Sequence, residues 1–219
     1  VEDTGTGCYN TTPLELIVQQ APVANIPDAL RYCDPDNDGF GLFMLTDADT
    51  EITGGATGLS VSYHETLTNA ENNVDAIDTT IDYNNIVVNT QTVYARVESA
   101  TIATDCATIV PLELIVEPTP QLITPTPLEV CDDGNGDGFT LIDLSVKNSE
   151  ITGDSSNYIV SYHYNQTDAE TGANPVPEPY SNTTQNDQLF VSIMDASTGC
   201  RSTTTLNVTV LDSPAIDND

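Results

Sequence analysis

The chain has 219 residues, enough for one large or two ordinary domains, and its 34 acidic and 4 basic side chains give a formal net charge of −30. The four basic residues are scattered along the sequence, at Arg31, Arg96, Lys147 and Arg201. Clustered cations are what bind nucleic acids and anionic lipids, so this composition excludes both as partners and favours Ca²⁺. No apolar run is long enough for a membrane-spanning helix, so we expect no direct membrane insertion.

The N-terminal stretch contains a segment that returns later in the chain. The letters PLELIV occupy residues 13–18 and occur again at residues 111–116, an offset of 98. Cys8 and Cys106 precede the two copies and are separated by the same 98 residues. A match of this length indicates an internal repeat of about one hundred residues.

This repeat predicts the domain organisation. We expect residues 1–20 to be the last strand of a truncated preceding repeat, residues 21–118 to form one complete repeat and residues 119–219 a second. The junctions between them are rich in proline, so we expect them to be short and semi-rigid.

Apolar residues within each repeat alternate with polar ones in the period of a half-buried strand. With 38% apolar residues in such runs, the chain reads as a folded β protein and not as a disordered acidic one. Helical periodicity is limited to single turns near residues 69–72 and 167–172. The predicted inward residues are Leu59, Val61, Tyr63, Val93, Ala95, Val97, Leu112, Leu114 and Val116 in the first repeat, and Tyr158, Val160, Tyr162, Leu189, Val191, Ile193, Leu206, Val208 and Val210 in the second.

Six or seven short strands per repeat, separated by Gly, Asn, Asp and Pro, predict the fold class. We expect an all-β protein made of tandem antiparallel β-sandwich repeats, immunoglobulin-like or of another Greek-key type. A jelly roll remains the alternative, because the Trp of antibody-like domains is missing.

Each repeat opens with an acidic loop that follows a cysteine. Alternate carboxylates in a tight turn can direct their oxygens at a hard cation, and a glycine allows the sharp reversal. The bidentate Glu of an EF-hand loop is missing, so waters, backbone carbonyls or distant carboxylates would complete the shell. The alternative is a plain turn held by side-chain hydrogen bonds. We predict Ca²⁺ as the cofactor, with the ligands Asp34, Asp36 and Asp38 in the first repeat and Asp133, Asn135 and Asp137 in the second.

The five cysteines are expected to be oxidised, since small β repeats with cysteines at fixed places are typical of exported proteins. The favoured pairing lies within repeats, Cys33 with Cys106 and Cys131 with Cys200, which leaves Cys8 without a partner. The rival pairing joins Cys8 to Cys33 and Cys106 to Cys131, across two equal spacings of 25 residues.

Catalytic chemistry finds little support in the sequence. His64 and His163 occupy the same place in the two repeats, on the strand face opposite the apolar stripe, so we expect both to be solvent-exposed. Neither has a nearby cysteine pair for zinc or a nucleophile to activate. Tandem copies would also duplicate any active site, so we expect no enzyme.

Several motifs recur in order in both repeats. They are CDPDNDGF and CDDGNGDGF, a following apolar strand, Ile-Thr-Gly, an SYH strand and a late cysteine. This pattern resembles the tandem repeats of very large surface adhesins of Bacteroidota, especially flavobacterial ones exported by the type IX route and linked to gliding. The resemblance covers nearly the whole chain and implies an extracellular, cell-surface location.

Two functions follow as hypotheses. The first is a stalk or adhesive segment stiffened by Ca²⁺ and disulfides, with neighbouring repeats and surface polysaccharide as partners. The second is a carbohydrate-binding accessory module of a secreted polysaccharide-degrading enzyme, which an exposed row of tyrosines would favour. In addition, Asp78-Thr79-Thr80 resembles the acceptor for O-linked sugars in Bacteroidota, which marks Thr79 as a glycosylation candidate.

Overall fold

The computed structural model describes residues 1–2, 4–16, 18–100, 106–134 and 136–213. The chain divides into two compact units, one made of residues 1–29, 44–83 and 92–113 and the other of residues 30–43, 84–91 and 114–219. Both units contain parts of the first repeat. Among the described helices, none is long and apolar enough to cross a membrane.

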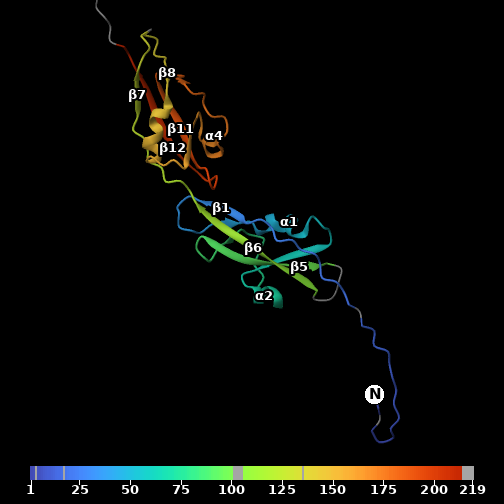
Figure 1. Cartoon of the computed structure of the whole chain (residues 1–219). Coiled ribbons are helices and arrows are strands. Elements are labelled where there is room, and N and C mark those ends of the chain that lie inside the picture. The colour runs from blue at the N-terminus through green and yellow to red at the C-terminus, as the bar shows by residue number, and fades with distance from the viewer. Residues whose placement is uncertain (3, 17, 101–105, 135, 214–219) are drawn as a thin grey trace, which may run out of the picture. The chain divides into compact units, whose positions relative to one another are not determined.

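The first repeat is a sandwich of a four-stranded and a two-stranded sheet (Figure 1). The strand order of the large sheet is β1-β6-β5-β3, and β2 pairs with β4 in the small sheet. The strands are β1 (Leu30–Asp34), β2 (Leu42–Phe43), β3 (Leu59–His64), β4 (Tyr83–Asn84), β5 (Thr90–Ser99) and β6 (Ala107–Pro118).

The second repeat has the same arrangement, with a large sheet in the order β7-β12-β11-β9 and a small sheet of β8 and β10. Its strands are β7 (Leu128–Cys131), β8 (Leu141–Ile142), β9 (Tyr158–His163), β10 (Tyr180–Ser181), β11 (Asn186–Asp195) and β12 (Arg201–Leu211). The predicted fold class, tandem immunoglobulin-like β-sandwich repeats, is confirmed.

One pairing differs from the antiparallel expectation. The opening strand runs parallel to the last strand in both repeats, so Cys33 lies opposite Glu117 and Cys131 lies opposite Leu211. The other pairs of the large sheets that join β3 to β5, β9 to β11 and β11 to β12 are antiparallel. This parallel pair places the cysteine of the opening strand beside the end of the last strand.

The predicted inward stripes of the long strands form the cores. The side chains of Val93, Ala95, Val97, Leu112 and Leu114 have no exposed surface. In the second repeat, the buried stripe consists of Leu189, Val191, Ile193, Leu206, Val208 and Val210. Burial of each Val, Leu or Ile side chain contributes about 1.5–3 kcal/mol to folding, which makes these stripes the main source of stability.

Short helices cap the sandwiches where the sequence indicated at most a single turn. The helices α2 (Leu67–Asn72) and α4 (Gln166–Thr171) begin after Thr66 and Asn165, whose side chains accept backbone N–H groups of their first turns. Both end in a left-handed residue, Asn73 in the first repeat and Gly172 in the second.

The Ile-Thr-Gly motif, in contrast, ends a helix that the alternation analysis did not predict. A 3-10 turn leads into α1 (Asp49–Thr53) and another into α3 (Asn148–Thr152); the two turns are η1 (Leu45–Ala48) and η2 (Leu144–Lys147). The isoleucine of each motif is fully buried, and the glycine takes the left-handed conformation that closes the helix.

Each Pro-rich junction is fixed to the repeat that follows it. The backbone N–H of Asn25 donates to Ile52 in the first repeat, as that of Ile123 donates to Ile151 in the second. The last strand adds a second tie, because the hydroxyl of Thr108 donates to the Pro22 carbonyl and that of Ser202 to the Pro120 carbonyl. Each junction is therefore part of the sandwich after it.

Candidate functional site

The acidic loop of the first repeat is organised around one buried carboxylate. Asp34, at the end of β1, is 1% exposed and accepts the backbone N–H groups of Gly39 at 2.7 Å, Asn37 at 2.9 Å and Asp36 at 3.3 Å. Asp38 accepts the N–H of Phe40 at 2.8 Å. Asp34 therefore closes the loop in the way expected of an Asx turn.

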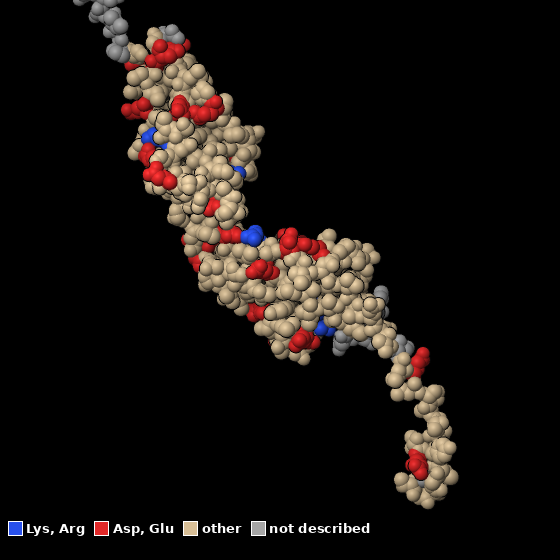
Figure 2. All heavy atoms as spheres, viewed as in Figure 1, with Lys and Arg blue, Asp and Glu red and all other residues tan. Residues whose placement is uncertain are grey.

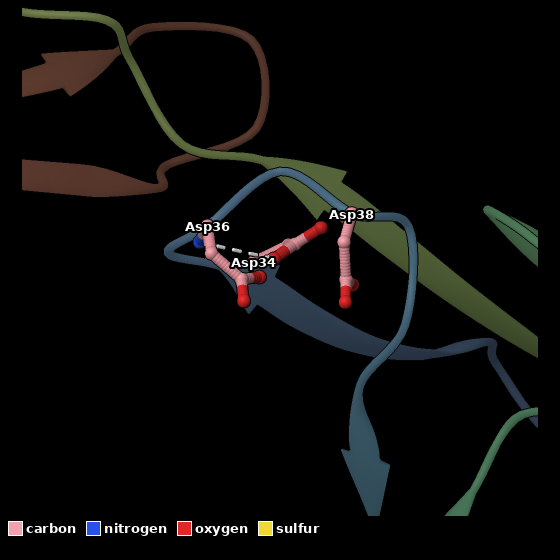
Figure 3. A group of neighbouring side chains, drawn as sticks. All are labelled: Asp34, Asp36 and Asp38. Atoms are coloured by element: carbon pink, nitrogen blue, oxygen red, sulfur yellow. Dashed lines mark hydrogen bonds between the residues drawn. The ribbon is translucent and has the colours of Figure 1, made fainter.

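The same loop brings three carboxylates together. Asp34, Asp36 and Asp38 each offer an oxygen within 4.8 Å of the others, and only Asp34 is buried (Figure 3). Burial opposes the ionisation of Asp34, but its N–H partners, led by Gly39, hold its pKa below the usual value. The pKa of Asp36 is raised, because its side chain shares a hydrogen bond with Asp34 and is repelled by Asp38. The three carboxylates therefore repel one another, and a bound cation would reduce this repulsion.

A buried asparagine that directly follows β4 holds the backbone of this loop. The Asn85 side chain is 2% exposed, accepts the N–H of Gly41 at 2.7 Å and donates to the Gly39 carbonyl at 3.1 Å. Gly39 fits because it has a positive φ and because a Cβ there would lie 2.6 Å from the Val88 side chain. The motif analysis did not select Asn85, although it follows Tyr83 by two residues as Asn182 follows Tyr180.

The acidic loop of the second repeat has the same arrangement, but its buried carboxylate, Asp132, was not among the predicted ligands. Asp132 takes the place of Asp34: it is 5% exposed and accepts the N–H groups of Gly134 at 2.9 Å, Gly136 at 3.0 Å and Gly138 at 2.7 Å. Asn182 makes the bonds of Asn85, to the Thr140 N–H and the Gly138 carbonyl, both at 2.8 Å.

The carboxylate cluster of this loop consists of Asp132, Asp133 and Asp137. The predicted Asp133 and Asp137 therefore belong to it, and the predicted Asn135 lies outside the described residues. Asp132 was not among the predicted ligands, because the two predicted sets keep the same distance from Gly39 and Gly138, an offset of 99. The step of 98 from Cys33 to Cys131 would have paired Asp34 with Asp132.

The predicted disulfides within repeats are wrong. Cys33 is bonded to Cys200, with an S–S distance of 2.06 Å, a Cα–Cα distance of 5.5 Å and a sequence separation of 167. Cys33 lies opposite Glu117, near the end of β6, whereas Cys106 directly precedes the start of β6. The rise of about 3.3 Å per strand residue separates these two ends by about 30 Å, far beyond the reach of a disulfide.

The same geometry excludes a bond between Cys131 and Cys200. Cys131 lies opposite Leu211 at the end of β12, and Cys200 directly precedes the first residue of that strand. The rival pairing is wrong as well, since Cys33 is not bonded to Cys8 and Cys131 is a solvent-exposed thiol.

The histidines are buried, which contradicts the predicted exposure. His64 and His163 have no exposed surface. The Nδ1 atoms contact the carbonyl oxygens of Val74 at 2.8 Å and Ala173 at 2.7 Å, in the segments that follow α2 and α4. These segments cover the strand face that the alternation pattern assigned to solvent. Each histidine thus holds the segment after its helix on the sheet, and its Nε2 contacts a serine hydroxyl of its own strand, Ser62 at 3.1 Å in the first repeat and Ser161 at 2.8 Å in the second.

The glycosylation candidate is accessible. Thr79 is exposed, and the neighbouring Thr80 donates its hydroxyl to Asp78 at 2.7 Å. Modification of Thr79 stays a prediction.

Acidic side chains are spread over the visible surface of both repeats, and basic ones are few (Figure 2). The model of the Flavobacterium inter-domain disulphide bond domain matches residues 29–120 and again residues 127–214, and the chain belongs to this family. The Cys33–Cys200 disulfide joins the first of these copies to the second.

Comparison with curated proteins gave no match. Among solved structures, similarity was found to a SusE-like surface-located polysaccharide-binding protein from the Bacteroides thetaiotaomicron heparin utilisation locus, at 9% identity and TM-score 0.31 over 70% of this chain and 29% of that one. Drosophila N-cadherin EC1-3 is 13% identical at TM-score 0.26, over 86% of this chain and 66% of that one. The titin domains I67–I69 are 8% identical at TM-score 0.28, over 85% and 64%. The chain thus spans under two thirds of each, and nothing about ligands transfers at this similarity.

Proposed function

We propose that this chain is a non-catalytic extracellular segment of a surface adhesin, in which consecutive sandwich repeats are stapled to one another by disulfides. The observation that supports this proposal is the bond between Cys33 of one repeat and Cys200 of the next. Disulfides persist in oxidising surroundings, which supports an extracellular location. The family match supports a flavobacterial surface protein, and export by the type IX route and a part in gliding belong to the same proposal.

The position of the cysteines supports a continuous ladder of such bonds. Within one repeat, the two cysteines lie at opposite ends of the last strand, so each end of the sandwich carries one. Cys131 occupies the position of Cys33, and Cys106 that of Cys200. We therefore assign Cys131 to a bond with the repeat that follows it and Cys106 to a bond with the repeat that precedes it.

A spacer is better supported than a sugar-binding module. Seven tyrosines were candidates for a stacking platform, and four of them, Tyr63, Tyr83, Tyr162 and Tyr180, are buried in the cores. Tyr94 and Tyr158 are partly buried and only Tyr164 is half-exposed, so the described tyrosines form no exposed row. Binding of surface polysaccharide stays a possible property of the parent adhesin, and neighbouring repeats are the partners that the disulfide supports.

Ca²⁺ belongs to this proposal as the cofactor of the acidic loops. Asp34 and Asp132 already serve as loop caps, so the exposed carboxylates of Asp36, Asp38, Asp133 and Asp137 would supply the remaining oxygens. Hard carboxylate oxygens suit Ca²⁺, and bound cation would neutralise the repulsion within each cluster. The metal would stiffen the loop that directly follows each opening cysteine.

Pulling on single molecules tests the stapled spacer. When a chain is held by its ends, the bond between Cys33 and Cys200 shields the intervening residues from force, because tension passes through the sulfur atoms. A sequence separation of 167 corresponds to a hidden length of about 550–600 Å. We expect this length to be released only after reduction or in Cys200→Ser, with Cys131→Ser as the control that keeps the bond. Release under non-reducing conditions would contradict the proposal.

A further inference from the structure

An apolar segment near the N-terminus is exposed to solvent and belongs to no described strand. Residues 13–18 carry the letters PLELIV, and the described side chains Leu14, Leu16 and Val18 are 82%, 83% and 97% exposed. The same letters at residues 111–116 form the centre of β6, where Leu112, Leu114 and Val116 are 0%, 0% and 5% exposed. The same three apolar side chains are thus exposed to solvent in one copy and buried in a core in the other.

The environment of β6 shows what covers such a strand. β6 lies between β1, which runs parallel to it, and β5. Its inward residues fill the core, and the N–H of Val116 donates to the Asn89 carbonyl at 2.7 Å. β12 of the second repeat has the same surroundings, and there the N–H of Val210 donates to the Gln185 carbonyl at 2.9 Å. These features are therefore general to the last strand of this repeat.

We infer that residues 8–20 are the last strand of a third sandwich of this repeat class, whose remaining strands are not among those described above. The other strands of that same sandwich therefore cover the exposed apolar face. Leu14, Leu16 and Val18 enter its core, and the chain then continues into the junction fixed on the first repeat. Two observations support this inference. The sequence PLELIV occurs in this segment and in β6, and Cys8 stands at the position that Cys106 and Cys200 take in the other two repeats.

A chimera made from this sequence tests the inference. Residues 21–105, which supply the strands before β6, are fused directly in front of residue 8, so that residues 8–20 take the place of the last strand. Hydrogen exchange is measured at the amides of Leu14, Leu16 and Val18 in the chimera and in the original chain. We expect exchange in the chimera to be slower by at least about a hundredfold.

Three variants make the result specific. Leu14→Asp combined with Leu16→Asp should abolish the protection in the added repeat and leave the two original repeats unchanged. Glu15→Ala should leave it intact, because the matching Glu113 is exposed in β6. A control in which residues 21–118 precede residue 21 supplies the native last strand and should fold.

The outcomes are distinct. Unprotected amides at residues 14, 16 and 18 would overturn the inference, whether the added repeat is unfolded or folds without them. The disulfide ladder is tested separately in the same chimera by non-reducing peptide mapping, since it requires the added copy of Cys33 to bond Cys106. Protected amides without this bond would support the strand assignment and contradict the ladder.

Discussion

Arg96 and Arg201 stand on different strands of their repeats, yet both place their guanidinium groups at the C-terminal end of the short helix beside them. Arg96, on β5, donates to the carbonyl oxygens of Ala70 at 2.9 Å and Glu71 at 3.5 Å in α2. Arg201, on β12, packs against Gly172, the residue that closes α4. A cation at this end of a helix complements its exposed carbonyls.

This relationship predicts a compensated exchange. The position of Arg201 is Ala107 in the first repeat, and that of Arg96 is Ser192 in the second. Arg96→Ser should destabilise the first repeat by about 2 kcal/mol, since buried acceptors and Glu98 lose a charged donor. Adding Ala107→Arg should restore little by itself, because a Cβ at Gly172 would lie 2.5 Å from the Arg201 guanidinium and Asn73 stands there in the first repeat.

The triple variant Arg96→Ser, Ala107→Arg and Asn73→Gly should recover most of the loss. Thermal unfolding of the three variants and of Asn73→Gly alone measures these steps. A double variant as stable as the triple one would show that the glycine is not required.

Substitutions in the acidic loop should separate its two roles. Asp34→Ala leaves three backbone N–H groups without their acceptor and should cost about 2–4 kcal/mol with or without Ca²⁺. Asp38→Ala should cost little in chelator but should weaken the Ca²⁺ response of the first repeat more than that of the second. Asp137→Ala is the matched variant for the second repeat. Equal losses for Asp34→Ala and Asp38→Ala in chelator would contradict the division of roles.

Ca²⁺ should raise the melting temperature by an amount that depends on pH. A cation that binds the folded state at one hundred times its Kd adds about 2.7 kcal/mol. The raised pKa of Asp36 means that its carboxyl keeps its proton above the ordinary value of 3.8, so protons and Ca²⁺ compete there. The shift between millimolar Ca²⁺ and excess chelator should therefore shrink as pH falls towards this range.

The lowered pKa of Asp34 acts on the chain without metal. It contributes stability above the ordinary value of 3.8 that is lost as pH falls through the folded pKa. Calorimetry across the acidic range measures both effects. A melting temperature independent of Ca²⁺ at neutral pH, with no bound metal by elemental analysis, would leave the loops as simple turns.

The repeated letters and the alternation of apolar residues were sufficient to predict the sandwiches, because they report directly on burial. Val93, Ala95 and Val97 are inward for that reason. The disulfide could not be predicted in this way. It depends on the parallel pairing of β1 with β6, which a strand pattern does not encode. This pairing places Cys33 beside the last residues of β6, whereas Cys106 precedes the first residue of β6.

The candidate site was predicted in part. Asp36, Asp38, Asp133 and Asp137 lie in the clusters as expected, since a loop rich in Asp and Gly has few other ways to turn. Asp34 was predicted as a ligand, but its main contacts are with the backbone, and the supporting Asn85 comes from a segment 46 residues beyond Gly39. Such contacts between distant segments leave no periodic signal in the sequence.

The buried histidines give the last prediction. His163 is held between the Ala173 carbonyl at 2.7 Å and the Ser161 hydroxyl at 2.8 Å, and His64 makes the matching contacts with Val74 and Ser62 in the first repeat. His163→Phe keeps the ring volume but removes both ring nitrogens, so the partly buried Ala173 carbonyl and Ser161 hydroxyl lose these contacts. We expect a loss of about 2–3 kcal/mol in the second repeat alone, and faster hydrogen exchange in the segment after α4. His64→Phe should do the same to the first repeat, while Tyr164→Phe, at a half-exposed position next to His163, serves as the control. Full stability of both histidine variants would show that packing of the ring, and not its hydrogen bonds, holds these segments on the sheet.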